Sequence, residues 1–226
     1  MLIDLHTHST VSDGTQPPAE VVGSAVEAGI DVLALTDHDS TAGWSQASRA
    51  ARRLGITFVP GMEISCSRDG ISIHLLSYLH DPHEAQLAAT VTAARDSREQ
   101  RAERMVELLR RDVDVTWESV LEQVQPGATI GRPHIADALV ARGVVADRTE
   151  AFAGLLSASG PYYVRHYAPD PAEAVRLVLG AGGVPVMAHP AASSRGRVVA
   201  DAVIEELVDA GLAGLEVDHL DHTDAE

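Results

Sequence analysis

The sequence predicts an α/β protein with a mostly parallel sheet. Short apolar runs of strand length alternate with segments of helical pattern, and ionisable residues follow the runs. The 226 residues, of which 45% are hydrophobic, suffice for one large domain or for a domain with a sizeable insertion. The strand-like runs are Leu2–Leu5, Val32–Leu35, Thr57–Val59, Ile71–Leu79, Val184–Met187 and Leu215–Val217.

The helices between these runs carry recognisable end signals. Prolines open and a glycine closes the segment Pro18–Gly29. A second helix is expected over Ser40–Leu54, with Ser40 as its N-cap. Asp170 starts a third helix, which ends near Gly180.

Residues 83–158 interrupt this alternation. A long helix rich in arginine and glutamate is followed by predicted helices over Trp117–Val124 and Pro133–Arg142. We therefore expect a helical insertion over 83–158 that projects from an α/β core formed by residues 1–82 and 159–226.

The long helix carries four arginines at helical spacing. They are Arg95, Arg98, Arg101 and Arg104, with Glu99 and Glu103 interleaved. This pattern is typical of a solvated helix face, which we favour over a track for RNA.

The formal charge of −16 excludes broad, unassisted binding to nucleic-acid backbones, duplexes included. It leaves room for a small phosphorylated substrate, because bound divalent cations invert the field at a site. All 17 basic residues are arginine, so a phosphate contact must come from arginine, histidine or backbone amides. The single cysteine, Cys66, suits a reducing cytoplasm, and we find no membrane-crossing stretch or signal peptide.

Ionisable residues follow the carboxyl ends of the apolar runs. The first run leads to His6, His8 and Asp13, the second to Asp37, His38 and Asp39, the third to Glu63, the fifth to His189, and the last to residues 218–222. In parallel α/β proteins the active site lies at these strand ends. His74 sits within its own run, on the face opposite Ile71, Ile73 and Leu75, and can point the same way.

Taken alone, each of these residues has an ordinary explanation. A lone histidine is usually a surface or core residue, Asp13-Gly14 reads as a turn, and 218–222 reads equally well as a solvated tail. Together they predict a metal site. Mixed histidine and carboxylate ligands suit Mn²⁺, Zn²⁺ or Fe, and the surplus of ligands predicts two or three ions, with Mn²⁺ our first expectation.

Five sequence blocks, in order, closely resemble the PHP (polymerase and histidinol phosphatase) family. They are His6-Thr7-His8-Ser9, Asp13-Gly14, Thr36-Asp37-His38-Asp39, Gly61-Met62-Glu63-Ile64 and Ala188-His189-Pro190. The resemblance implies a distorted (β/α)7 barrel, a smaller relative of the TIM barrel. Segments 131–134 and 163–166 are similar to the branch of small bacterial phosphoesterases that act on nucleotides, which includes 3′,5′-nucleoside bisphosphate phosphatases and a 5′→3′ exoribonuclease.

The resemblance also implies a three-ion site. His6 and His8 would hold a first ion with Glu63, which would bridge to a second ion held by His74 and His189. Asp13 and His38 would hold a third. Catalysis by a metal-bound hydroxide would then depend on Asp13, His38, Glu63 and His189. Asp37 and Asp39 would be structural partners that hold the ligands in position.

A phosphate clamp is expected from the insertion and the segment after it. Arg132 lies at the start of a helix, whose free amides favour anions, and His134 follows it. Arg165, His166 and His219 complete the candidate substrate-binding residues. For the two arginines, an ordinary surface position is an equally good interpretation.

The chain departs from the family at its end. The resemblance implies a final Ser-Asp-x-His block, and none occurs before Glu226. We expect either that the sequence is a fragment lacking a last strand–helix unit, or that His219 and His222 substitute for the block.

The sequence thus predicts a metal-dependent phosphoesterase that hydrolyses a phosphomonoester of a nucleotide or the end of a short oligonucleotide. Two alternatives stay open. One is an amidohydrolase-type deaminase, a class that also opens with His-x-His but normally lacks the Asp37-His38-Asp39 block and Glu63. The other is a non-catalytic PHP module, as in some polymerases.

Overall fold

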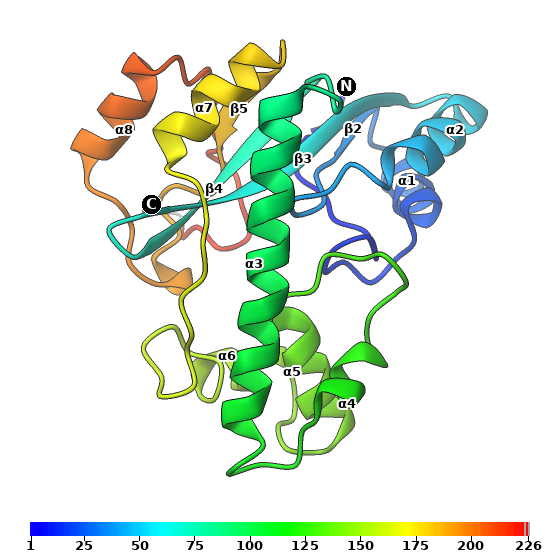
Figure 1. The fold of residues 1–226 in the computed structure, drawn as a ribbon. Coiled ribbons are helices and arrows are strands. Elements are labelled where there is room, and N and C mark those ends of the chain that lie inside the picture. The colour runs from blue at the N-terminus through cyan, green and yellow to red at the C-terminus, as the bar shows by residue number, and fades with distance from the viewer. Residues whose placement is uncertain (224, 226) are drawn as a thin grey trace.

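A computed structural model describes residues 1–223 and 225, and its architecture confirms the predicted α/β class. Six strands form one curled sheet in the order β1-β2-β3-β4-β5-β6, with helices packed on it (Figure 1). The strands are β1 Ile3–Asp4, β2 Val32–Leu35, β3 Thr57–Arg68, β4 Ile71–Tyr78, β5 Val184–Met187 and β6 Gly214–Leu215. Since six strands are described, a seven-unit barrel stays a prediction.

The sheet mixes two strand directions. The pairs β1–β2, β2–β3 and β5–β6 are parallel, whereas β4 runs antiparallel to both β3 and β5. A tight turn joins β3 to β4, with Asp69 and Gly70 at φ 52° and 72°. An Asp-Gly turn with two positive φ angles matches the right-handed twist of a hairpin, so it reverses the chain there.

Strand β3 is much longer than the predicted Thr57–Val59. Residues 57–60 pair with β2, and Gly61–Arg68 pair with β4 instead. The prediction stopped too early because Pro60 and Gly61 interrupt the apolar run. In the fold they lie where the strand changes partner, and the second half of β3 carries Glu63.

The helix ends follow local chemistry, with one correction. Helix α1 spans Pro18–Glu27, α7 spans Pro171–Gly180 and α8 spans Asp201–Asp209. The Asp170 side chain caps α7 by accepting from Ala172 and Glu173 N–H, as predicted. Helix α2 spans Trp44–Leu54, so Ser40 is not its N-cap. A turn separates them, in which the Ser40 hydroxyl accepts from Ala42 N–H.

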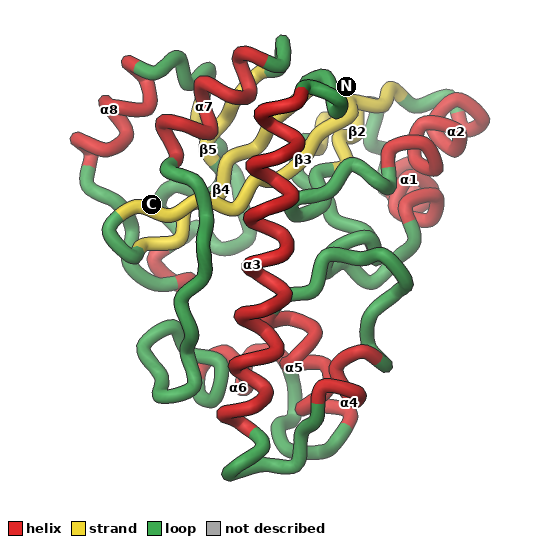
Figure 2. The backbone as a smooth tube through the Cα atoms, viewed as in Figure 1, coloured by secondary structure: helices red, strands yellow, loops and turns green. Residues whose placement is uncertain are grey.

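Helix α3, Ala85–Leu109, joins two hydrophobic cores (Figures 1 and 2). Its first half contributes Leu87 and Val91 to the sheet core, which also contains Ile64, Leu75 and Val175. Its second half contributes to a distal core shared with α4 (Trp117–Leu121), α5 (Arg132–Ala141) and α6 (Arg148–Ala153). At 1.5 Å per residue the 25-residue helix is about 38 Å long, enough to reach both.

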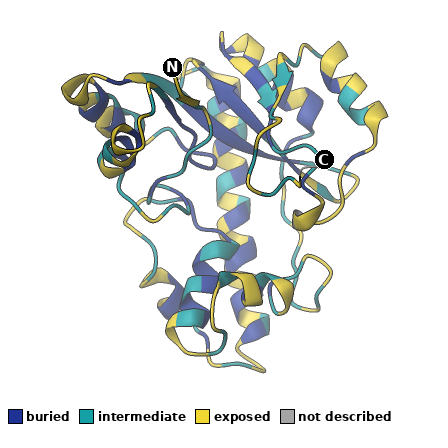
Figure 3. Cartoon of the chain, turned by 180° about the vertical axis from the view of Figure 1, so that it is seen from behind, coloured by how far each residue is buried: buried dark blue, intermediate teal, exposed yellow. Residues whose placement is uncertain are grey.

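The buried residues are divided between the same two cores. Figure 3 shows one buried region along the strands of the sheet and another among the distal helices. A third cluster packs α1 and α2 on β2 through Val22, Leu35 and Ala47. The predicted helical character of 83–158 is thus observed, while its separation as a subdomain stays a prediction. No helix among the described residues is both long and apolar enough to cross a membrane.

The sheet core predicts a clear stability effect. Leu75 in β4 is fully buried, so Leu75→Ala should lower the free energy of unfolding by about 2–5 kcal/mol through lost burial and a residual cavity. Leu54→Ala, at an exposed site that ends α2, should change it by less than about 0.5 kcal/mol. Urea titrations of both variants measure this. Equal effects would contradict the assignment of Leu75 to the core.

Candidate metal centre

The candidate site is built on the carboxyl ends of neighbouring strands. His6 and His8 follow β1, His38 follows β2, and His189 follows β5. Glu63 and His74 lie within β3 and β4. An isolated parallel bridge pairs His38 with Glu63 beyond the end of β2, which holds these two residues side by side.

Glu63 is the centre of this group. Its side chain is 1% exposed, and five imidazoles surround its two oxygens. Oε1 lies 2.7 Å from His74 Nδ1 and 3.1 Å from His189 Nε2. Oε2 lies 3.0 Å from His8 Nε2, 3.2 Å from His38 Nδ1 and 3.3 Å from His6 Nε2.

Asp13 extends the group on one side. Its Oδ1 is 3.4 Å from His8 Nδ1, and its Oδ2 is 3.5 Å from His38 Nε2. The ligand atoms fall into overlapping sets compact enough to hold one ion each: His6–His8–Glu63, His8–Asp13–His38, His38–Glu63–His74 and His6–Glu216–His219. The structure therefore brings together all seven residues predicted as metal ligands.

Glu216 is a member of the site that the sequence analysis missed. Its Oε1 lies 2.9 Å from His6 Nδ1, and its Oε2 accepts a hydrogen bond of 2.7 Å from His189 N–H. The signal was a lone acidic residue inside the apolar run Leu215–Val217, directly after β6. Sequence reasoning passed over it in favour of the more conspicuous residues 218–222.

Of those later residues, the structure brings His219 to the site. Its ring centroid is 4.9 Å from that of His189 and 5.4 Å from that of His6. His222 is engaged elsewhere, because its Nε2 accepts from Ala191 N–H and its Nδ1 lies 2.8 Å from the Val217 carbonyl.

The pKa values of the clustered side chains are shifted by burial and by the charged groups close to them. Burial raises the pKa of Glu63, but His38 and His74 outweigh burial and hold the pKa well below its usual range. Burial lowers the pKa of His6, yet hydrogen bonds to Glu216 and Glu63 raise it to about 10. Burial dominates at His38, whose pKa falls well below its usual range.

These features fit a divalent ion. His38 Nδ1 is buried, and among the described residues it has no hydrogen-bond partner, so its lone pair is available. Glu63 Oε2 lies beside it at 3.2 Å, and two lone pairs aimed at one region attract a cation. Cys66 lies in the sheet core, where burial raises the pKa of its thiol, so nitrogen and oxygen are the donors. This donor set suits Mn²⁺, Zn²⁺ or Fe.

Asp37 fixes the loop that carries His8 and Asp13. Its carboxylate accepts hydrogen bonds from Ser9 N–H and Ser9 Oγ, both at 2.7 Å, and from Ser12 Oγ at 2.8 Å. Ser12 Oγ in turn lies 3.2 Å from His8 Nδ1. The position of the His8 ring therefore depends on a buried carboxylate behind the loop.

Asp39 supports the other side of the group. It accepts from Ser65 N–H at 2.8 Å and Ser65 Oγ at 2.7 Å, and Arg98 Nη1 lies 3.2 Å away. Its own backbone is in the left-handed region, with φ 49°. These bonds connect the chain after β2 to the segment of β3 that follows Glu63.

The prediction that the arginines of the long helix form a solvated face is wrong at Arg98 and Arg101. Arg98 and Arg101 are only 7% and 6% exposed, whereas Arg104 is exposed. Helical spacing shows which residues share a face but not what covers that face. Here Asp39 and Ser65 cover Arg98, and Tyr163 and His166 cover Arg101.

The predicted phosphate-binding residues lie beside these arginines. Arg132 Nη1 donates to the Leu156 carbonyl at 3.1 Å, and its guanidinium lies over the rings of Phe152 and Tyr163. His166 Nδ1 is 3.3 Å from Arg101 Nη1. Arg165 is exposed.

The His134 side chain forms hydrogen bonds with backbone groups. It is buried, its Nδ1 accepts from Gly131 N–H at 3.2 Å, and it also bonds to the backbone of Ser12. This contact ties the start of α5 to the loop of Asp13.

Comparisons with known proteins agree with this geometry. A family profile for the PHP domain matches residues 4–153. A 3′,5′-nucleoside bisphosphate phosphatase from Chromobacterium violaceum is 37% identical over 95% of this chain and 76% of its own length. A 5′-3′ exoribonuclease from Haemophilus influenzae is 33% identical over 83% and 68%. The crystal structure of a Bifidobacterium adolescentis protein, named as a metal-dependent phosphoesterase, superimposes with a TM-score of 0.95 at 40% identity, covering 99% of this chain and 79% of that one.

The loop geometry predicts that Gly14 tolerates no side chain. A Cβ at Gly14 would lie 2.4 Å from the His8 carbonyl oxygen, so Gly14→Ala must displace the loop of Asp13. We expect a loss of more than about 2 kcal/mol in the free energy of unfolding and weaker Mn²⁺ binding, measured by urea titration and calorimetry.

Gly23→Ala is the matched control. Its Cβ meets nothing within 4 Å in α1, so this variant should be about 0.5–1 kcal/mol more stable. Unchanged Mn²⁺ affinity in Gly14→Ala would show that the loop position does not matter to the site.

Proposed function

The chain belongs to the PHP domain family of metal-dependent phosphoesterases, and we propose that it hydrolyses a phosphomonoester of a nucleotide or of a short oligonucleotide end. The observation that carries the proposal is the buried Glu63 carboxylate with five imidazoles around it, flanked by Asp13 and Glu216. Such a surplus of nitrogen and oxygen ligands suits a multinuclear centre. The relatives named above act, by their names, on nucleoside bisphosphates and RNA ends.

We assign two or three ions, with Mn²⁺ as the first choice, to the four compact ligand sets. When bound, divalent ions supply Lewis-acid stabilisation of phosphate oxygens and activate water as a nucleophile. The ions would be held by His6, His8, Glu63, His74, Asp13 and His38, and the geometry adds Glu216 and His219 to the candidates. His189 lies outside the four sets, but its Nε2 is 3.1 Å from Glu63 Oε1, and we propose it as a ligand at the same centre. Asp37 and Asp39 keep the ligand-bearing segments in place.

The arginines on and beside α3 would bind the substrate. In a protein of net charge −16, Arg98, Arg101 and Arg132 lie close enough together to affect one another's charge. We propose that this group, rather than the whole surface, attracts the phosphorylated substrate, so that duplex nucleic acid is not bound broadly.

Three further proposals concern the whole protein. Residues 83–158 would act as an insertion beside the site, carried by a core of residues 1–82 and 159–226. The fold would be the seven-unit barrel of the family. A location in the cytoplasm suits the single, buried Cys66.

Removal of one ligand tests the activity. With Mn²⁺ and adenosine 3′,5′-bisphosphate, we expect phosphate release that falls at least about 100-fold in His8→Ala, because two of the ligand sets lose a nitrogen. His83→Ala, at an exposed histidine outside these sets, is the control and should keep full activity. Colorimetric phosphate assays measure both. Ammonia release from a nucleoside without phosphate release would indicate a deaminase instead.

Metal loading should release protons. In the metal-free protein His6 has its pKa raised to about 10, so its ring holds a proton at pH 7.5, and the pKa of His8 is shifted in the same direction by Glu63 and Asp13. An ion needs the ring nitrogen lone pairs, so binding displaces protons and the affinity for Mn²⁺ falls as the pH falls. Calorimetry in buffers of different ionisation enthalpy should show about one proton or more per chain. An enthalpy independent of the buffer would mean that the His6 ring is already neutral.

A further inference from the structure

The loop after β1 is bonded to the distal helices at three consecutive residues. In each case a backbone group of the loop is the partner of a residue from the segment 129–148. The pairs, from loop to segment, are Val11 with Thr129, Ser12 with His134, and Asp13 with Arg148. Residues 10–13 form turns rather than a helix or strand, so these bonds help to determine where the Asp13 side chain lies.

Arg148, the first residue of α6, has a guanidinium that joins two parts of the chain. Its Nε and Nη2 donate to the two oxygens of the Asp137 carboxylate, each at 2.6 Å. Its Nη1 donates to the Asp13 carbonyl at 3.2 Å. Because the guanidinium is planar, the direction of Nη1 is fixed once Asp137 holds the other two nitrogens. Asp137 therefore determines where Arg148 meets the loop.

The position of Asp137 is itself fixed by the distal core. It lies in α5 three residues after the buried His134, so the two side chains are neighbours on one helix face. The same helix contributes Ile135 and Leu139, both fully buried, to the distal core. Arg148 is thus held from a rigid element rather than from a loop.

The Asp13 carboxylate must lie accurately if it is to hold an ion. It stands between His8 and His38, and of the four compact ligand sets it belongs to one, the set that it forms with these two residues. Distances between a metal and its ligands vary by only about 0.2 Å, so a loop shift of about 1 Å would remove the carboxylate from the set. The other three sets would keep their ligands.

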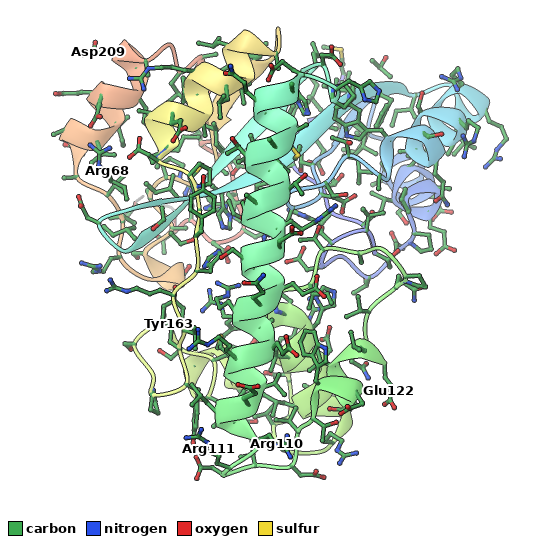
Figure 4. All side chains as sticks on the ribbon, viewed as in Figure 1. Arg68, Arg110, Arg111, Glu122, Tyr163 and Asp209 are labelled. Atoms are coloured by element: carbon green, nitrogen blue, oxygen red, sulfur yellow. The ribbon has the colours of Figure 1, made fainter. Side chains whose placement is uncertain are left out.

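The pair of Arg148 and Asp137 is suited to this positioning. Charged side chains at the far end of the distal helices, such as Arg110, Arg111 and Glu122, are exposed (Figure 4). The Arg148 and Asp137 side chains are partly exposed and are together neutral, so the contact adds no net charge beside an ion. Ion pairs of this exposure contribute little to the stability of a fold, so the pair can be removed without unfolding the protein.

We propose that Arg148, held by Asp137, is a positioning residue for Asp13. Its contact keeps the loop where the set of His8, Asp13 and His38 binds one ion. The inference rests on the proposed metal centre and adds to it two residues that lie outside the ligand sets. It makes the affinity of one ion depend on the distal helices, while the sets without Asp13 are independent of them.

Mn²⁺ binding tests this role without a measurement of activity. In Arg148→Gln we expect the affinity of one ion to fall about 10- to 100-fold, as it does when a group that orients a metal ligand is lost, and the other ions to change less than about threefold. The EPR signal of free Mn²⁺ during a titration measures this. Arg142→Gln is the matched control, because Arg142 also pairs with an aspartate, Asp114 at 2.6 Å, and it should leave every ion unchanged.

Double variants identify the affected ion. Asp13→Ala removes a ligand from the same set, so the addition of Arg148→Gln to this variant should weaken no further ion. Asp137→Asn should weaken the same ion as Arg148→Gln, and the two together should be no worse than Arg148→Gln alone, because Asp137 acts through Arg148. Additive losses in either combination would overturn the proposal.

The remaining outcomes separate this inference from the proposed function. If Arg148→Gln binds every ion as tightly as wild type, the positioning role is wrong even where phosphomonoesters are hydrolysed. If one ion is weakened but no phosphomonoester is hydrolysed, the proposed function fails and the positioning role stands. No binding of Mn²⁺ by wild type would overturn both.

Thermal unfolding of the metal-free proteins detects a merely structural role. Arg148→Gln and Arg142→Gln should both unfold within about 4 °C of wild type, because each removes a partly exposed ion pair. A much larger decrease in Arg148→Gln, together with equal weakening of all ions, would show that Arg148 supports the fold as a whole and would contradict the proposal.

Discussion

The burial of the Glu63 carboxylate is the constraint on which the rest of the site depends. A carboxylate that is 1% exposed must be compensated by positive charge, and the chain places five imidazoles within 3.3 Å of it. These imidazoles come from the ends or interiors of β1, β2, β4 and β5, so the sheet must curl to bring them to one point. The same requirement explains why ions and protons compete for the group.

The segments that carry the candidate ligands are held in place by two buried aspartates, Asp37 and Asp39, whose carboxylates each accept several hydrogen bonds. Asp37 holds Ser9 and Ser12 beneath His8, and Asp39 holds Ser65 beyond Glu63 while pairing with Arg98. Both aspartates are buried, and both carboxylates accept hydrogen bonds from donors in nearby loops and strands. The positions of the ligands are thereby determined by hydrogen bonds rather than by apolar packing alone.

Helix α3 connects this centre to the basic region beside it. Its apolar residues enter two separate cores, which leaves its middle turns to cross the space between them. Arg98 and Arg101 lie on those turns, one beside Asp39 and the other beside His166. A strongly acidic protein thus has a local concentration of guanidinium groups next to a cluster of histidines and carboxylates, an arrangement suited to phosphate.

The sequence by itself determined the α/β class and most helix ends, which follow from local periodicity and capping residues. It also predicted, from strand ends and from the family resemblance, the seven residues from His6 to His189 that the fold brings together. Only the tertiary structure decided the length of β3, the antiparallel β4, the role of Glu216 beside His6 and the burial of Arg98 and Arg101. Each of these depends on which distant segment pairs with or covers a residue, and spacing along one chain does not encode its partner across the fold.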